Sequence, residues 1–209
     1  MFNVLCFVDS NTFGTNPSGG RWAREVRWTG VLQQRLGKDF YVIEEGLGGR
    51  TASAEDFLES DKNGRRHLPN ALRSHRPLDL VILMLGTNDM KHRFNLLPVD
   101  IAQGAAELGR VVETYDYGPG YPIPKVLLVS PILIGEGVEH SPFSGFSADA
   151  VQVSRQLAPL YQAHAEEHGW LYLDAASVAK ASGLDKLHMD SDSHRSLALA
   201  IENVIKKSI

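Results

Sequence analysis

Disulfides, membrane spans and secretion signals are the features that this sequence lacks. The 209 residues include one cysteine, Cys6, so no disulfide can form within the chain. Cys6 lies in an apolar run, where a buried thiol packs like a small hydrophobic group. No apolar stretch is long enough to span a bilayer, and the first residues lack the basic region of a signal peptide. We therefore expect a cytoplasmic protein without a membrane partner.

Concentrated charge is also absent. The formal net charge is -4, and acidic and basic residues are interspersed without a long run of either sign. Binding to nucleic acid or to an anionic membrane would require a basic cluster. The sequence therefore favours a small-molecule partner and no nucleic acid. Its length and its 43% hydrophobic content suffice for one well-buried core, so we expect a single domain over residues 1–209.

Short apolar runs alternate with segments of helical periodicity along the chain. The runs rich in β-forming residues, which predict strands, are 2–8, 40–43, 78–85, 125–130 and 170–173. Apolar residues at helical spacing predict helices within 101–115, 153–164 and 197–205. This alternation is typical of a parallel sheet covered by helices on both faces. The predicted class is α/β, in a three-layer α/β/α sandwich, with ligand sites beyond the carboxyl ends of the strands.

Three of the predicted strand ends carry polar or glycine-rich turns. Ser10 directly follows the first strand, where a serine is placed for nucleophilic attack but is also a common turn or N-cap residue. The glycine-rich stretch 46–51 lets the backbone approach a ligand closely. It lacks the third glycine of a dinucleotide motif and the lysine of a P-loop, so nucleotide binding is disfavoured. The Asn88 amide, after the third strand, is suited either to donate to an oxyanion or to close an Asx-turn.

A histidine near the C-terminal end is the candidate base. His188 follows Asp185 by three residues and precedes the last predicted helix. This spacing allows Nδ1 to face the carboxylate and leaves Nε2 for a serine hydroxyl. His194 is the competing base, but we place it in the first turn of the final helix, in a surface role. We therefore favour His188 as the base for Ser10.

Longer stretches of sequence surround these residues. They read CFVDSNT at 6–12, VRWTGVL at 26–32, VIEEGL at 42–47 and DLVILMLGTND at 79–89. With these motifs the chain resembles the GDSL/SGNH hydrolases along essentially its full length. It most resembles the branch of arylesterases and acyltransferases that also perform perhydrolysis. The resemblance implies a flavodoxin-like five-stranded parallel sheet, a short-chain carboxylic ester as substrate, no cofactor or metal, and a homo-oligomer.

The resemblance also implies roles for individual residues. Ser10 would be the nucleophile, and Asp185 with His188 would complete a catalytic triad. The oxyanion hole would consist of the Ser10 N–H, the Gly49 N–H and the Asn88 side chain. These donors would stabilise the negative charge that develops on the ester oxygen during attack.

One position departs from the family pattern, and several residues are candidates for the pocket walls. Val8 stands where the family usually has glycine, and a β-branched residue tolerates positive φ poorly, so we expect Val8 to be an ordinary strand end. The residues expected to line the substrate pocket are Asp9, Asn11, Phe13, Trp22 and Leu187. Trp28 and the loop 135–147 are further candidate walls.

Other functions stay open at this point. His164 and His168 fit the inverted zinc-protease pattern His-x-x-Glu-His, although no third ligand is evident and a cationic histidine at a helix C-terminus is favourable without a metal. A non-catalytic binding module is a further alternative, because a fold does not fix a function. Among hydrolases, a carbohydrate acetylesterase that uses the same triad is the alternative to an arylesterase.

Overall fold

The computed structural model describes residues 1–143 and 145–208. Its strands are β1 (Phe2–Val8), β2 (Phe40–Gly46), β3 (Leu80–Met84), β4 (Lys125–Ser130) and β5 (Leu171–Asp174). Its α-helices are α1 (Ser10–Phe13), α2 (Trp28–Leu36), α3 (Gly64–His75), α4 (Pro98–Thr114), α5 (Asp149–His168) and α6 (Ser191–Ser208). All the predicted strands are confirmed. Those at 2–8 and 125–130 have the predicted ends, whereas the others begin or end at different residues.

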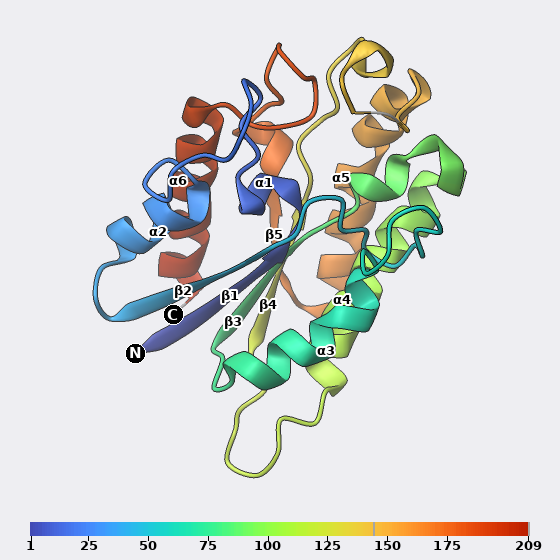
Figure 1. The fold of residues 1–209 in the computed structure, drawn as a ribbon. Helices are drawn as coiled ribbons and strands as arrows, with labels where there is room; N and C mark the ends of the chain where they lie inside the picture. Colours follow the sequence, from blue (N-terminus) through green and yellow to red (C-terminus); the bar gives the residue numbers. More distant parts are fainter. Residues whose placement is uncertain (144, 209) are drawn as a thin grey trace.

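The strands form one parallel sheet in the order β2-β1-β3-β4-β5. The chain leaves β1 toward β2 on one side and continues from β3 to β5 on the other. The connections therefore diverge between β1 and β3, which is where open α/β sheets place their ligands. Figure 1 shows the sheet as the middle layer, with α2 and α6 on one face and α3, α4 and α5 on the other. The predicted three-layer α/β/α class is confirmed.

The strands bury both of their faces, which explains their continuous apolar sequences. Along β1, Leu5 and Phe7 pack into the core beneath α3, α4 and α5. Val4, Cys6 and Val8 point the other way, into the core beneath α2 and α6. Cys6 is a buried free thiol there, in the packing role that its apolar surroundings predict.

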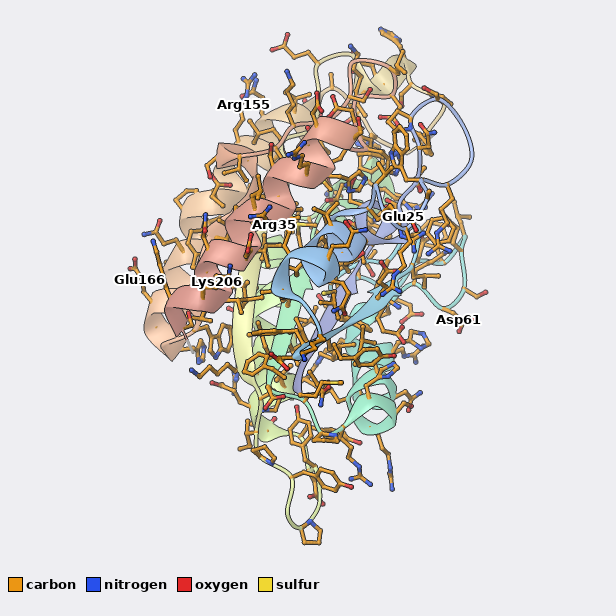
Figure 2. The ribbon with its side chains drawn as sticks, turned by 90° about the vertical axis from the view of Figure 1, so that its left-hand side faces the viewer. Glu25, Arg35, Asp61, Arg155, Glu166 and Lys206 are labelled. Atoms are coloured by element: carbon orange, nitrogen blue, oxygen red, sulfur yellow. The ribbon has the colours of Figure 1, made fainter. Side chains whose placement is uncertain are left out.

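Polar contacts join the two helices of the α2/α6 face. Figure 2 looks onto this face and shows both helices lying over the sheet. Arg35 from α2 forms an ion pair with Glu202 of α6, and Lys206 pairs with the same carboxylate at 2.6 Å. Arg35 and Lys206 are themselves well exposed, so these pairs contribute little stability compared with the buried apolar layer beneath them.

Three helices are missing from the sequence-based prediction: the single-turn α1 and the longer α2 and α3. α2 buries Trp28 but includes Gly30, a weak helix former, near its start. α3 is largely polar, contains Pro69, and buries Leu68 and Leu72 as its large apolar side chains. Packing against the sheet stabilises both helices despite weak local signals. Among the helices of the described residues, none has the length and apolar character that crossing a membrane requires.

Candidate active site

Ser10 begins the short helix α1 at the carboxyl end of β1. Val8 is the last residue of β1, buried and aligned with Gly46 of β2 and Met84 of β3. It is therefore an ordinary strand end, as predicted. Asp9 caps α1, and its Oδ1 accepts a hydrogen bond from the Asn11 N–H at 2.9 Å. This cap starts a helix immediately after the strand and holds Ser10 at the sheet edge.

The structure brings His188 to Ser10 from the other end of the chain. His188 Nε2 lies 2.9 Å from Ser10 Oγ, and His188 Nδ1 lies 2.8 Å from Asp185 Oδ2. All three side chains are nearly inaccessible, with exposed fractions of 7% for Ser10, 1% for His188 and 2% for Asp185. Hydroxyl, imidazole and carboxylate are thus joined in series, in the order that nucleophilic catalysis by serine requires.

The Asp185 carboxylate also shapes the turn that presents His188. Its Oδ1 accepts the N–H groups of Leu187 at 3.0 Å and His188 at 2.9 Å. Burial acts to raise the pKa of Asp185, but the hydrogen bonds from the imidazole and from these N–H groups outweigh it and hold the pKa below its ordinary value. Asp185 therefore stays ionised beside the imidazole and fixes its orientation.

The predicted amide donors lie on the other side of Ser10. Gly49 has φ of 80°, a left-handed conformation that favours glycine, in the turn after β2. Asn88 begins the 3₁₀ turn Asn88–Met90 after β3, and its Nδ2 donates to the Arg50 carbonyl at 3.1 Å. That bond uses one of the two amide hydrogens and fixes the plane of the Asn88 side chain. The second hydrogen is left for an acceptor in the cleft.

A cleft of about 310 Å³ connects these groups. Ser10, His188, Gly49 and Asn88 all line it. The other lining residues are Thr15, Gly48, Glu59, Lys91, Pro142, Phe143 and Leu187. The Phe143 ring packs edge-on against the His188 imidazole, with centroids 4.7 Å apart. The cleft therefore has an apolar wall near the imidazole and a charged wall, Glu59 and Lys91, near Gly49.

The pocket prediction needs correction at several positions. Leu187 lines the cleft, and so do Pro142 and Phe143 of the predicted loop 135–147, of which Ser144 lies outside the described residues. The predicted residues that do not line it are Asp9, Asn11, Phe13 and Trp22, together with the candidate wall Trp28. Within α1, Ser10 is the residue that lines the cleft, and the side chains of the other predicted residues are directed elsewhere.

The predicted pocket residues that do not line the cleft form hydrogen bonds behind it. Asn11 Oδ1 accepts the Met189 N–H at 3.0 Å and so ties α1 to the segment that follows His188. Trp22 Nε1 donates to the Met189 carbonyl at 3.3 Å. Trp28 is fully buried, and its Nε1 donates to Thr12 Oγ1 at 2.9 Å. These contacts hold α1, which carries Ser10, and the segment that follows His188 in place.

The surface role predicted for His194 is wrong. His194 does lie in the first turn of α6, but it is fully buried, and its Nδ1 accepts the Trp28 N–H at 3.3 Å. Burial lowers the pKa of His194 to about 4, so it is neutral at physiological pH. The packing of α6 against α2 encloses this histidine, and periodicity within α6 alone gives no sign of that contact.

The His164 and His168 pair lies near the C-terminal end of α5, away from this cleft. His164 Nδ1 is 3.8 Å from Glu167, and His168 stacks on Trp170 with ring centroids 4.3 Å apart. Within residues 1–143 and 145–208, no group of three or more metal-ligating side chains is present, at this pair or elsewhere. The third ligand that a zinc site needs is therefore not supplied by the described part of the chain.

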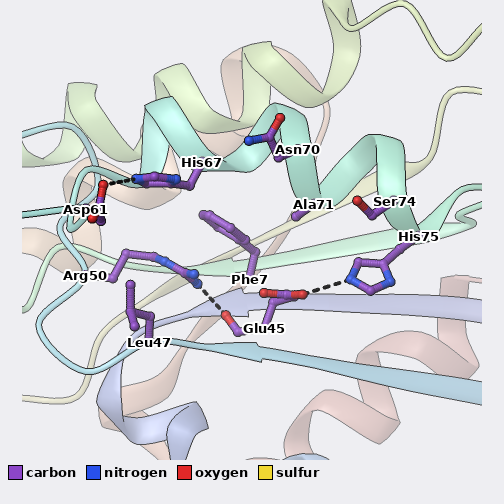
Figure 3. Close-up of a pocket in the computed structure, with 10 residues that line it drawn as sticks. All are labelled: Phe7, Glu45, Leu47, Arg50, Asp61, His67, Asn70, Ala71, Ser74 and His75. Atoms are coloured by element: carbon purple, nitrogen blue, oxygen red, sulfur yellow. Dashed lines mark hydrogen bonds and ion pairs between the residues drawn. The ribbon is translucent and has the colours of Figure 1, made fainter.

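Sequence reasoning also missed Arg50, a buried side chain behind the amide donors. Its guanidinium lies over the Phe7 ring, 3.9 Å from the centroid, and donates to the carbonyls of Val8, at 2.8 Å, and Glu45. Arg50 also lines a separate hollow of about 320 Å³ between β2 and α3. Figure 3 draws the residues around it. The described side chains of that hollow do not include a serine bonded to a histidine, so we assign no hydrolytic chemistry to it.

Serine, imidazole and carboxylate joined at the carboxyl edge of a parallel α/β sheet form an arrangement that is typical of serine-dependent hydrolases. The chain belongs to the GDSL-like lipase/acylhydrolase family, whose sequence pattern matches residues 9–198. No curated protein sequence matches the chain.

Several solved structures resemble the protein over the whole of both chains, among them an aryl esterase and a carbohydrate acetylesterase. The aryl esterase of M. smegmatis is 40% identical, with a TM-score of 0.92, and 100% of each chain is covered. Est24, a carbohydrate acetylesterase from Sinorhizobium meliloti, is 37% identical, with a TM-score of 0.94 and the same coverage. The sequence-based assignment to the GDSL/SGNH hydrolases is confirmed.

Proposed function

We propose that the protein is a serine esterase that cleaves short, acetyl-like acyl groups from carboxylic esters such as aryl esters. The observation that carries this proposal is the hydrogen-bonded series from Ser10 Oγ through His188 to Asp185. The similarity to an aryl esterase supports the substrate class. The small volume of the cleft, about 310 Å³, with Phe143 and Leu187 on its wall, supports a short acyl group.

In the proposed reaction, His188 Nε2 accepts the Ser10 proton as Ser10 Oγ attacks the ester carbonyl. The carbonyl oxygen becomes an oxyanion, which the N–H groups of Ser10 and Gly49 and the Asn88 amide stabilise. Collapse of this intermediate breaks the ester bond, and His188 returns the proton to the departing alcohol. Asp185 stabilises the imidazolium throughout these steps.

The acyl group then leaves Ser10 by the same chemistry in reverse. Water, activated by His188, attacks the acyl-enzyme and releases the acid. An alcohol or a peroxide that outcompetes water takes the acyl group instead, so acyltransferase and perhydrolase activities belong to the same proposal. The cytoplasmic location and the homo-oligomer stay predictions.

Replacement of Ser10 tests the proposal directly. Ser10→Ala should abolish hydrolysis of 4-nitrophenyl acetate without changing the circular dichroism spectrum. Ser130→Ala is the matched control, because Ser130 is a buried serine at the end of β4 that bonds Asp174 and does not line the cleft. If Ser10→Ala retains full turnover, the proposed mechanism is wrong.

A carbohydrate acetylesterase is the second candidate. The similarity to Est24 favours it, and so does the charged wall of Glu59 and Lys91, because charged side chains hydrogen-bond well to sugar hydroxyls. The ratio of kcat/KM for acetylated xylose to kcat/KM for 4-nitrophenyl acetate separates the candidates. A ratio well above one favours the sugar ester, and a ratio well below one favours the aryl ester.

A further inference from the structure

Asp89 is a buried carboxylate next to the active site that the proposed reaction does not use. It directly follows Asn88 in the 3₁₀ turn after β3, and it is 1% exposed. Across the part of the chain that the structure describes, no basic side chain forms an ion pair with it. A buried charge without a counter-ion needs some other compensation, because desolvation strongly disfavours the ionised form.

Backbone amides provide that compensation, and those of three consecutive residues come from one loop. Asp89 Oδ2 accepts the Ala52 N–H at 2.8 Å, and Oδ1 receives longer contacts from Ser53 at 3.4 Å and Ala54 at 3.5 Å. These residues lie in the loop between β2 and α3, shortly after Gly49. The carboxylate therefore ties that loop to the end of β3, as an anion held in a nest of N–H groups.

Asn88 binds the same loop at Arg50, the residue that directly follows Gly49. Its amide donates to the Arg50 carbonyl at 3.1 Å, while the neighbouring Asp89 holds the backbone at Ala52. On the opposite side, the Arg50 guanidinium is bonded to the ends of β1 and β2, as Figure 3 shows for Glu45. Before Gly49, the Leu47 N–H donates to the Val8 carbonyl at 3.2 Å, so the segment that carries Gly49 is bonded to the sheet edge on both of its sides.

We propose that Asp89 is a positioning residue for the oxyanion hole. It holds the Gly49 N–H and the Asn88 amide in the relative positions that allow both to donate to one oxyanion. This inference rests on the proposed function. Asp89 does not line the cleft, so it acts through the loop and not on the substrate. An aspartate suits this role because its carboxylate offers acceptors to several N–H groups at once, whereas an asparagine would turn an NH₂ donor toward some of them. A misplacement of about 1 Å in a catalytic group reduces rates by about 100-fold.

The test compares Asp89→Asn with Asp174→Asn. Asp174 is the matched control, because it is an aspartate at the end of β5 that accepts the Ala176 N–H at 3.0 Å and lies outside the cleft. With 4-nitrophenyl acetate, Asp89→Asn should lower kcat by about 10- to 100-fold and change KM by less than about twofold. Affinity for a phenylboronic acid, which forms a tetrahedral adduct with the serine, should fall by a similar factor. Asp174→Asn should leave all three quantities nearly unchanged.

A double-mutant cycle with Asn88→Ala distinguishes positioning from a general loss of structure. If Asp89 acts through the oxyanion hole, the combined loss in Asn88→Ala/Asp89→Asn should be at least about fivefold smaller than the product of the single losses. Should Asp89→Asn unfold, Asp89→Glu serves instead, since it keeps the charge but displaces both oxygens. The same loss of kcat and the same non-additivity are expected from it.

The outcomes separate this inference from the proposed function. If Ser10→Ala and Asn88→Ala are inactive but Asp89→Asn keeps kcat within about threefold of the parent, Asp89 has no positioning role and the proposed function stands. Multiplicative losses in the double-mutant cycle overturn the positioning role as well. If Ser10→Ala and Asn88→Ala are both fully active, the proposed function fails and this inference fails with it.

Discussion

The two sides of the cleft are each built around a buried aspartate, and the two aspartates are held differently. On the imidazole side, Asp185 is 2% exposed and bonds both a side chain, His188, and backbone N–H groups. On the amide side, Asp89 is 1% exposed and bonds backbone N–H groups alone. At nearly equal burial their pKa values move in opposite directions. Burial raises the pKa of Asp89 to about 6, although the hydrogen bonds from backbone N–H groups act to lower it. For Asp185, the hydrogen bond from the imidazole helps to hold the pKa below its ordinary value.

This difference indicates a division of tasks at one sheet edge. In the proposed reaction the imidazole side moves protons, which fits a carboxylate that contacts a titratable partner. In the same reaction the amide side keeps donors fixed while charge develops, which fits a carboxylate that contacts the backbone. Variants that perturb one side at a time should separate these two tasks.

Loss of the base should have the largest effect. His188→Asn should lower kcat by about 10,000-fold or more, because removal of a triad member leaves only the contributions of binding and the oxyanion hole. His194→Asn is the matched control, since it also replaces a buried histidine and keeps an acceptor for the Trp28 N–H. Steady-state kinetics on folded protein should show normal turnover for His194→Asn. Equal losses in the two variants would contradict the role of His188.

Loss of the amide donor should have the next largest effect. Asn88→Ala should lower kcat by about 100- to 1,000-fold, the range found when one oxyanion donor is removed. Asn63→Ala is the control, because Asn63 is a buried asparagine that caps α3 and does not line the cleft. An Asn88→Ala variant with normal kcat would remove Asn88 from the oxyanion hole.

The opposite pKa shifts predict opposite effects of pH on stability. For Asp89 the folded-state pKa is about 6 against an ordinary value of 3.8, so the native state binds more protons between these values and loses stability as pH rises through them. The shift of about two units corresponds to about 3 kcal/mol. Tyr161 nearby stays neutral in this range, because burial raises its pKa well above 10.

Denaturant titrations at several pH values check this prediction. As pH rises from 4 to 7, the parent should lose up to about 3 kcal/mol of unfolding free energy, whereas Asp89→Asn should not. The difference in unfolding free energy between variant and parent should therefore shift by this amount in favour of the variant. Asp185→Asn should behave in the opposite way, because the parent has a lowered Asp185 pKa and loses that stabilisation as pH falls below about 4. Parallel pH profiles for the two variants would contradict the comparison.

The smallest effect is expected at the cleft wall. Phe143→Ala should remove the ring that packs against His188 and widen the apolar side of the cleft. We expect kcat/KM for 4-nitrophenyl butyrate and hexanoate to rise relative to the acetate by a few-fold, consistent with about 1 kcal/mol for an aromatic contact. Chain-length profiling of parent and variant measures it. An unchanged profile would show that Phe143 does not limit the acyl group.

Much of the fold was predictable because the strands are buried on both faces. The run 80–85, for example, is apolar throughout, and this signal does not depend on neighbours. The helices α2 and α3 were not predictable in the same way, since packing on the sheet compensates for Gly30 and Pro69. The triad candidates could be placed because each follows a strand end or precedes a helix at a spacing that the chemistry requires.

The supporting residues were harder to predict. Arg50, Asn11 and Asp89 act through contacts with backbone atoms far away in the sequence, and no local periodicity reports such contacts. Asn11 was predicted as a pocket residue, but its side chain bonds Met189 behind the site. The burial of His194 also depends on the packing of one helix against another.

Covalent labelling of Ser10 tests the central claim most directly. A fluorophosphonate probe reacts with a serine that a histidine activates, and mass spectrometry of the digested protein locates the adduct. We predict one adduct per chain, on the peptide that contains Ser10, and no adduct on folded Ser10→Ala or His188→Asn protein. A folded parent protein that remains unlabelled, or that carries the adduct on another residue, would contradict the assignment of Ser10 as the nucleophile.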